Sequence, residues 1–444
     1  MTRRLIVIVS LLSIYALTAQ AQKKWNLEEC INHATEHNIS IKQQELRRET
    51  AEISLNTSRM SRLPDLNASL GNTWNRSSNT DSLISNKHII SSSASFSIST
   101  SVPVFTGFRI KNEIERDKIA LEAATLNLER AKEDLSLSVT YLFLEVLFNK
   151  EIVEISKEQL EISQTQIART KALVDAEKVP KSQYYDIEAQ VAQDEVSLVN
   201  AEKNLELSLL DLAQSLELEH ETDFDILVPT FDHPIIEHMA SLQKPDIVFA
   251  NALSVKPGIK MIELEVEGAE KSHNIAKSAY YPSLSLNAGY GTGYSYIYDL
   301  PWPNESFSSQ IKDGREYIGL SLSIPIFNRF STRNNVKTSK INILNQKLAL
   351  EDAKKTLYKE IQTAHLNATS ALKAYLASNK AVKASSESFK YTQERYEVGK
   401  STVFEFNDAK LALTRSQSEM VKAKYDYIFR TKILDFYNGI PIRL

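Results

Sequence analysis

Apolar and polar residues alternate along two stretches of the chain. Between Pro64 and Pro103 and again between Pro282 and Pro325, the even positions are mostly apolar and the odd positions are mostly polar or small. The apolar set is Leu66, Ala68, Leu70, Trp74, Ile90, Ala94, Phe96, Ile98 and Val102, then Leu284, Leu286, Ala288, Tyr290, Tyr294, Ile318, Leu320, Leu322 and Ile324. A period of two is typical of strands with one apolar face. The pattern predicts a strand hairpin in 64–104 and a second one in 282–327.

A period of seven follows each strand region. Apolar residues recur every seven positions at Ile114, Leu121, Leu128 and Leu135, and again at Val336, Ile343, Leu350 and Leu357. This spacing is typical of coiled-coil seams. We expect long helical hairpins over 105–219, with a tip near 175–183, and over 328–437, with a tip near 397–402. A helix from about 108 to 179 would be roughly 108 Å long, which exceeds a compact domain.

The phrase SVPVFTGF at 101–108 returns as SIPIFNRF at 323–330. Pro103 and Pro325 are 222 positions apart, as are Phe105 and Phe327, and the heptad positions repeat at the same spacing. The chain is therefore a tandem duplication, in which each half runs from a helix through strands to a long helical hairpin. The phrase marks the strand-to-helix joint of each half, because proline suits the end of a strand.

The strands have the length and the flanking aromatic residues of outer-membrane strands. Tyr280, Tyr281, Phe105 and Phe327 lie near one set of ends, and Tyr296, Tyr298 and Trp302 near the other. Four strands cannot close a barrel alone, since single-chain barrels start at about eight and an open edge in hydrocarbon leaves backbone groups unpaired. Two chains would supply eight strands with a filled interior, and three would supply twelve with room for a pore. The serine- and glycine-rich polar face favours the twelve-stranded barrel with an open pore.

The ends and the middle of the chain complete the expected organisation. Residues 1–21 are predicted to be a signal peptide, with Arg3 and Arg4 before a short apolar run and a small-x-small site at Ala19–Ala21. The remaining predicted segments are an N-terminal helix (22–63), a linker (220–257), a second-repeat helix (258–281) and a C-terminal tail (438–444).

Candidate chemistry is sparse. The formal net charge of −4 gives no sign of nucleic-acid binding, and a single cysteine, Cys30, excludes an internal disulfide. HATEH at 33–37 matches an inverted zinc-protease pattern, but no motif places a third ligand. The linker segment 220–246 adds His220, His233 and His238. We predict no metal, no cofactor and no enzymatic activity.

The duplicated strand and helix pattern resembles the TolC-type outer-membrane efflux proteins. The most specific residues are the repeated joint phrase and RYEVGKSTVFEFNDA at 395–409. The resemblance implies a mainly α fold with a membrane part, namely a homotrimer with a shared twelve-stranded β-barrel in the outer membrane. A long α-helical coiled-coil barrel would continue it through the periplasm. It also implies a passive exit duct that works with a periplasmic adaptor protein and an inner-membrane transporter, in a tripartite efflux pump or a type I secretion system.

The resemblance further implies roles for residues near the helix tips. Glu405 and Asp408 match acidic residues that ring the tunnel entrance and govern cation sensitivity, and Tyr396 and Asp186 match an entrance latch. Ser401 stands where some relatives have an arginine of that latch. The alternative for the two acids is that they simply favour a helix start.

Pro180 and Gly399 are the predicted turning points of the two hairpins, where an adaptor would make contact. Aligning one with the other places Asp186 opposite Glu405. The alternative for the whole chain is a periplasmic coiled-coil structural or adaptor protein whose strands form a soluble β-domain.

Overall fold

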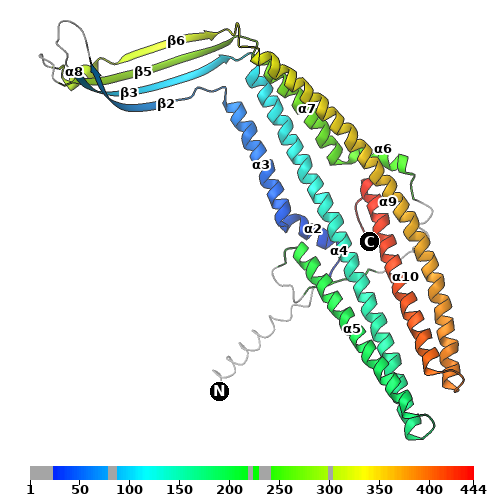
Figure 1. Ribbon diagram of the computed structural model, residues 1–444. Helices are drawn as coiled ribbons and strands as arrows, with labels where there is room; N and C mark the ends of the chain where they lie inside the picture. Colours follow the sequence, from blue (N-terminus) through cyan, green and yellow to red (C-terminus); the bar gives the residue numbers. More distant parts are fainter. Residues whose placement is uncertain (1–23, 79–87, 219–223, 230–241, 299–303) are drawn as a thin grey trace, which may run out of the picture. The chain divides into compact units, whose positions relative to one another are not determined.

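The computed structural model describes residues 24–78, 88–218, 224–229, 242–298 and 304–444 (Figure 1). The predicted signal peptide, the histidines 220, 233 and 238, and Trp302 lie outside these ranges. The chain forms two compact units. One holds residues 47–125 and 261–351, and the other holds residues up to 46 with 126–260 and 352–444. The two are described separately below as the strand unit and the hairpin unit.

The strand unit contains a four-stranded antiparallel sheet. Its strands are β2 (Asn67–Ser78), β3 (His88–Phe105), β5 (Ser283–Ile297) and β6 (Arg315–Ser323), in the order β2-β3-β5-β6. The register pairs even positions with even positions, as in Leu70 with Phe96 and Leu286 with Leu320. Because side chains alternate between faces, this register puts the apolar residues of all four strands on one face.

That apolar face is not covered within the described residues. Leu70 is 82% exposed and Ile318 is 78% exposed, and every residue of β6 is exposed. β2 and β6 are the two edges, and each leaves a row of backbone groups unpaired in the described sheet. The second strand connection also contains a short helix that the sequence pattern did not predict, α8 (Phe307–Lys312).

Each strand-to-helix joint has the same backbone conformation. β3 leads into α4 (Arg109–Asp175), and the chain after β6 leads into α9 (Ser331–Glu397). Gly107 and Phe108 have φ of 61° and 66°, and their counterparts 222 positions later, Arg329 and Phe330, have φ of 55° and 63°. The repeated sequence phrase is therefore a repeated left-handed turn, which non-glycine residues rarely adopt.

The aromatic residues of the phrase pack in the same way in both joints. Phe105 and Phe108 meet edge to face with ring centroids 5.4 Å apart, and Phe327 and Phe330 do so at 5.5 Å. Edge-to-face packing of this kind stabilises a turn beyond the area that it buries. Besides α8, the strand unit contains α7 (Pro257–Ser278), which begins in the hairpin unit, and the second half of α3 (Ile39–Met60).

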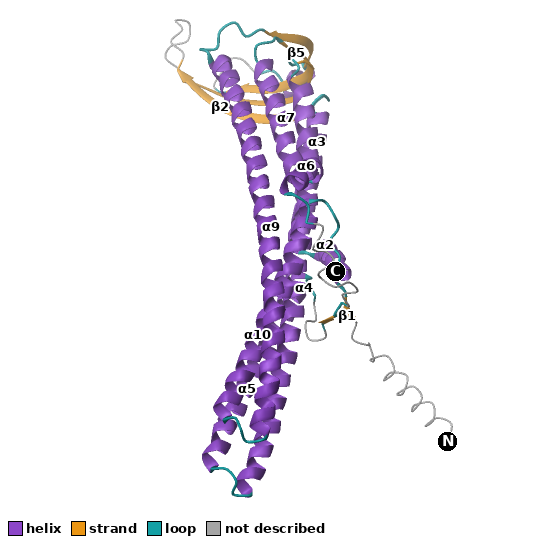
Figure 2. Cartoon of the chain, turned by 90° about the vertical axis from the view of Figure 1, so that its right-hand side faces the viewer, coloured by secondary structure: helices purple, strands orange, loops and turns teal. Residues whose placement is uncertain are grey.

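The hairpin unit contains the greater part of two helical hairpins, whose long helices α4 and α9 begin in the strand unit (Figure 2). α4 and α9 have 67 residues each, and α5 (Lys181–Ser215) and α10 (Val403–Tyr437) have 35 each. All four starts and ends are offset by 222 positions. The duplication therefore continues through the tips without insertion or deletion.

This offset corrects the alignment expected from the sequence. The counterpart of Gly399 is Glu177, not Pro180, since both residues have a left-handed φ, of 74° and 57°. In both turns the amide of the third residue after the helix bonds back to a carbonyl five residues earlier, as Lys178 N does to Leu173 O and Lys400 N to Arg395 O. Pro180 instead corresponds to Thr402, and both are N-caps. Asp186 accordingly corresponds to Asp408 rather than to Glu405.

The largest core of the hairpin unit lies where its helices meet α2 (Leu27–His37). It contains the buried residues Leu27, Cys30, Ala34, Val139, Phe143, Val146, Leu147, Leu212, Leu216 and Ile226. The predicted N-terminal helix is divided at Asn38 into α2 and α3. The predicted linker contributes α6 (Pro245–Val255) and β4 (Asp225–Ile226), which pairs in parallel with β1 (Lys24–Trp25).

Candidate functional site

The start of α10 holds Glu405 in a capping box. Glu405 Oε2 accepts hydrogen bonds from Ser401 Oγ at 2.5 Å and from the backbone amide of Thr402 at 2.9 Å. In return, the backbone amide of Glu405 donates to Thr402 Oγ1 at 3.2 Å. The hydrogen bond from Ser401, and after it the one from Thr402, lower the pKa of Glu405. The carboxylate is exposed and ionised at neutral pH, and it also caps the N-terminus of α10.

The other three residues matched to the family gate and latch are Asp408 on α10, Tyr396 at the end of α9 and Asp186 on α5. Asp408 and Asp186 are exposed. Tyr396 packs on Phe406, with ring centroids 5.1 Å apart, and Phe406 in turn packs on Phe389. Among the interactions of the described residues, none joins Tyr396 to Asp186. Within one chain, Tyr396 therefore packs against the hydrophobic cluster of Phe389, Phe406 and Leu413, which Ile162 of α4 also contacts, and the latch stays a prediction.

A contact that the sequence did not reveal joins the two hairpins close to their tips. Arg169 on α4 donates from Nη2 to the backbone oxygen of Glu397 at 2.8 Å, and its Nη1 lies 3.7 Å from Glu397 Oε1. Glu397 is the last residue of α9. Arg169 thus caps a helix of the other hairpin, where the carbonyl ends favour a positive charge.

A buried ion pair also joins the hairpins. Lys410 on α10 is only 2% exposed, and its Nζ contacts Asp194 Oδ2 on α5 and Ser163 Oγ on α4. Ser163 Oγ donates to Asp194 Oδ2 at 2.5 Å, and Gln190 Nε2 donates to Asp194 Oδ1 at 2.8 Å. Removing one partner of such a pair is strongly destabilising, because the other charge stays buried without compensation, whereas replacing both partners by apolar residues is often neutral.

Polar residues continue along the same side of α4. Gln159, Ser163, Gln166 and Thr170 are buried and follow the spacing of four, three and four residues that a coiled-coil seam uses. Buried side-chain atoms of Gln159, Gln166 and Thr170 make no hydrogen bond in the described part of the chain. Unmet polar groups weaken a buried interface. This stretch of α4 is therefore held less firmly than the apolar core.

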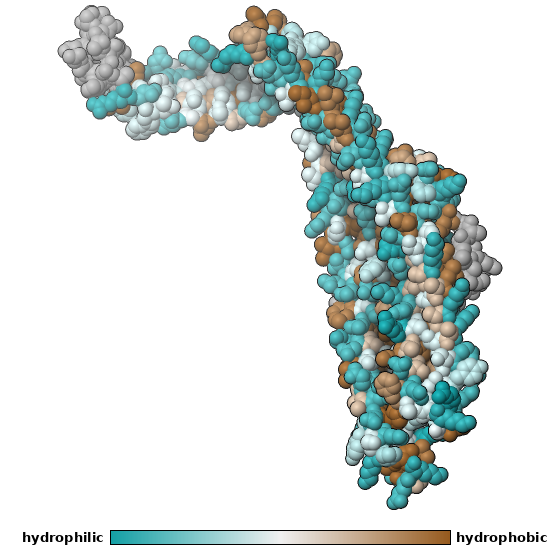
Figure 3. Space-filling model, turned by 45° about the vertical axis from the view of Figure 1, so that its right-hand side comes forward, coloured by the Kyte–Doolittle hydropathy of each residue, from teal (hydrophilic) through white to brown (hydrophobic). Residues whose placement is uncertain are grey.

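The hairpin ends expose large apolar side chains. Phe404 is 79% exposed, Val398 68% and Tyr185 63%. Figure 3 shows apolar side chains gathered at the free ends of the hairpins. Exposed apolar groups that cluster in this way mark surfaces that bind other proteins.

The histidines of HATEH lie on α2, and the rings of His33 and His37 stack with centroids 4.1 Å apart. Within the described ranges, no group of three or more histidine, cysteine, aspartate or glutamate residues could hold a metal ion.

An open sheet with an exposed apolar face, continued by helices of 67 residues, defines a class of membrane-associated protein with a long helical extension. The chain belongs to the outer membrane efflux protein family, whose model matches residues 30–217 and 248–434. It is accordingly an outer-membrane channel protein with a periplasmic helical extension. Across the described residues, α-helices are too short or too polar to cross a membrane.

The chain is similar to the outer membrane protein TolC of Vibrio cholerae, with 22% identity over 412 residues that cover 91% of this chain and 88% of the relative. The solved CmeC outer membrane channel of Campylobacter jejuni has the same fold, with a TM-score of 0.75 and 16% identity over 93% of this chain and 86% of its own. The open state of the MtrE outer membrane channel of Neisseria gonorrhoeae superposes with a TM-score of 0.70 and 20% identity, over 93% and 88% of the two chains.

Proposed function

We propose that three copies of this chain form one exit duct, with a shared twelve-stranded barrel in the outer membrane and a helical tunnel in the periplasm. The observation that carries the proposal is the four-stranded sheet with two unpaired edges and an exposed apolar face. In hydrocarbon each edge needs a partner. Pairing β6 of one copy with β2 of the next meets that need, and three copies leave an open pore.

The helices, like the sheet, have exposed apolar residues. On α3 these residues recur every seven positions at Ile39, Leu46, Ile53 and Met60, and on α9 they are Ile341, Leu344 and Leu348. A heptad stripe in contact with water favours a second helix packed on it. These stripes support association of neighbouring copies along their helices as well as along their strands.

Native mass spectrometry of the detergent-purified protein tests the assembly. We expect a trimer, and a stable monomer or dimer as the largest species would contradict the proposal. Membrane fractionation separates the duct from a periplasmic adaptor with a soluble β-domain. A duct stays in the outer membrane after alkaline and salt washing, whereas the adaptor is released.

We place the cation-sensitive entrance at Glu405 and Asp408. Three copies would bring six carboxylates into a narrow tunnel, which favours cations and disfavours anions. The exposed position of both side chains and the lowered pKa of Glu405 support this role. The double variant Glu405→Ala/Asp408→Ala should reduce single-channel block by divalent cations, and unchanged block would refute the role.

Opening would move one hairpin against the other within each chain. Such motions occur at interfaces that have two discrete arrangements. The polar side of α4 supports opening at the interface between the hairpins, because water can hydrogen-bond to Gln159, Gln166 and Thr170 when the hairpins part. The contact between Arg169 and Glu397 would have to break when the hairpins part, so it would act as a latch within one chain. The predicted pair of Tyr396 and Asp186 would act as a second latch in the assembled trimer.

The hairpin ends are the surface that we assign to a periplasmic adaptor, which would connect the duct to an inner-membrane transporter. The exposed side chains of Tyr185, Val398 and Phe404 support this assignment, and in the sequence they lie within a few residues of the N-cap Pro180 or of the turn residue Gly399. The variant Phe404→Ser should weaken co-purification of the adaptor while trimer assembly is unchanged. Equal recovery of the adaptor would contradict it.

A further inference from the structure

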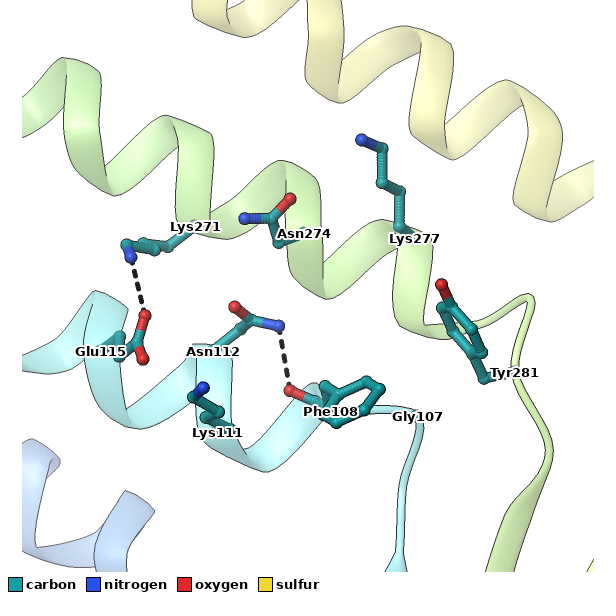
Figure 4. A pocket seen from close by; sticks show the side chains of 9 residues that line it. All are labelled: Gly107, Phe108, Lys111, Asn112, Glu115, Lys271, Asn274, Lys277 and Tyr281. Atoms are coloured by element: carbon teal, nitrogen blue, oxygen red, sulfur yellow. Dashed lines mark hydrogen bonds and ion pairs between the residues drawn. The ribbon is translucent and has the colours of Figure 1, made fainter.

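A hollow of about 340 Å³ lies in the strand unit between the start of α4 and the end of α7. Its lining residues are Gly107, Phe108, Lys111, Asn112, Glu115, Lys271, Asn274, Lys277 and Tyr281. Figure 4 shows Lys271 and Glu115 bridging the two helices at one end, Phe108 and Tyr281 at the other, and Asn112 and Asn274 between them. The volume is in the range of small-ligand sites.

The hollow carries excess positive charge. Lys271 Nζ lies 2.7 Å from Glu115 Oε2, and this hydrogen bond raises the pKa of Lys271 and lowers that of Glu115. Lys111 and Lys277 make no ion pair within the described part of the chain. The lining residues, three lysines and one glutamate, have a net charge of +2, while Glu267 and Glu270 on α7 act on Lys271 from outside the lining and Lys111 acts on Glu115. Burial lowers the pKa of the neighbouring His273, and Lys277 and Lys340 lower it further, in accord with a positive potential.

Hydrogen-bond donors and aromatic rings are arranged in order along the hollow. Asn112 Nδ2 donates one hydrogen to Phe108 O at 3.0 Å and keeps a second one, and the amide of Asn274 adds two more. The rings of Phe108 and Tyr281 meet edge to face 6.1 Å apart and are half-exposed. β3 ends at Phe105 and β5 begins at Ser283, so the rings lie on the strand side and the lysines lie on the helix side.

A tight turn fixes this arrangement. Gly107 has a φ of 61°, and a Cβ at this position would lie 2.6 Å from Ser278 O and 2.8 Å from Tyr281 Cβ. The turn before α4 is thus held directly against the end of α7. At this end of the hollow, the position of α4 against α7 is set by a close backbone approach.

We propose that this hollow binds the phosphate group of a glycerophospholipid from the periplasm-facing leaflet. The inference rests on the proposed function, in which the strands cross the membrane and the joint lies at its periplasmic surface. Lys111 and the amides of Asn112 and Asn274 hold the phosphate oxygens, and Lys277 approaches from the rim. The acyl chains pass Phe108 and Tyr281 toward the bilayer. Lysines beside aromatic residues at this depth attract anionic headgroups, and a phosphate accepts several charge-assisted hydrogen bonds at once.

The test uses the full-length trimer purified in a neutral detergent. Phosphatidylglycerol is titrated into wild type and Lys111→Gln/Lys277→Gln, and native mass spectrometry counts the retained lipids. The matched control is Lys373→Gln/Lys383→Gln, which removes the same charge from exposed positions of α9 in the hairpin unit. We expect roughly thirtyfold weaker binding only in the hollow variant, at about 1 kcal/mol for each lysine, and recovery in Lys111→Arg/Lys277→Arg.

Equal binding by wild type and the hollow variant would overturn the site, and so would equal loss in the control. A second arm adds inorganic phosphate as competitor. Displacement of the lipid only at large excess supports a lipid site, whereas displacement at equal concentration would overturn the lipid assignment. For each variant, membrane retention is measured on washed membranes before extraction, and trimer mass is measured on the purified protein. If these are intact while lipid binding is absent, only this inference fails; release by alkaline washing would remove the proposed function itself.

Discussion

Lys410 and Asp194 form a buried ion pair between the two helical hairpins, with Ser163 bonded to both. Lys410→Met leaves Asp194 buried with a charge and without its cation. We expect a loss of about 3–5 kcal/mol from the free energy of unfolding, measured by denaturant titration of the helical signal in detergent. The double variant Lys410→Met/Asp194→Leu should recover part of that loss. A change below about 1 kcal/mol in the single variant would show that the pair is unimportant for stability.

Arg169 should hold the hairpin tips together, because it donates to the end of α9 from the other hairpin. Arg169→Ala should raise the open probability of single channels in planar bilayers. Arg415→Ala serves as the control, since Arg415 is exposed and pairs with Glu419 of its own helix. Equal effects of the two variants would exclude a specific role for Arg169.

The pH dependence of cation block should follow the capping box. Hydrogen bonds from Ser401 and Thr402 lower the pKa of Glu405, so the carboxylate remains ionised below the usual range of glutamate, near pH 4.3. The contribution of these bonds to the stability of the cap is present above that range and is lost as the pH falls through the lowered pKa. In Ser401→Ala, divalent block should disappear at a higher pH than in wild type. Identical pH profiles would show that the cap does not set this titration.

Gly107 should be intolerant of a side chain, because a Cβ would collide with Ser278 O and the residue has a left-handed φ. Gly107→Ala should reduce the yield of assembled trimer and lower its thermal stability. Gly319→Ala on β6 is the matched control, since a Cβ at that position would have no neighbouring atom within 4 Å in the described part of the chain. Normal assembly of Gly107→Ala would mean that the joint can rearrange.

Cys30 should be protected from thiol reagents. It is completely buried in the hairpin-unit core, and burial raises its pKa to about 12. Since the thiolate is the reactive form, a maleimide at pH 7 should label the folded protein very slowly and the denatured protein rapidly. Rapid labelling of the folded protein would indicate that α2 opens readily.

The sequence predicted the elements well wherever one period continued over many residues. The alternation from Leu66 to Val102 identified strands, and the heptads beginning at Ile114 and Val336 identified the long helices. The alignment of the two hairpin tips was harder to predict. Pro180 and Gly399 both interrupt a helix, but Pro180 is an N-cap and Gly399 follows a helix C-terminus. The spacing of 222 found at the joints was the better guide to the register.

The contacts between the hairpins could not be predicted from a pattern. Lys410 lies between Phe406 and Leu413 on an otherwise apolar side of α10, and only the fold shows that Asp194 and Ser163 meet it. Arg169 has no sequence signature for its carbonyl partner. The capping box was visible, since Thr402 is followed three residues later by Glu405.

Because the two hairpins have matched lengths, deletions that shorten one of them must be made in the other as well. Removing one heptad from α4 and another from α5 would shorten the first hairpin by about 10 Å and leave the second at full reach. In the proposed trimer, an adaptor would then meet alternating short and long ends. Removing the corresponding heptads from α9 and α10 as well would restore a level rim, so that a shorter duct with an intact docking face can be made only by cutting both halves of the duplication together.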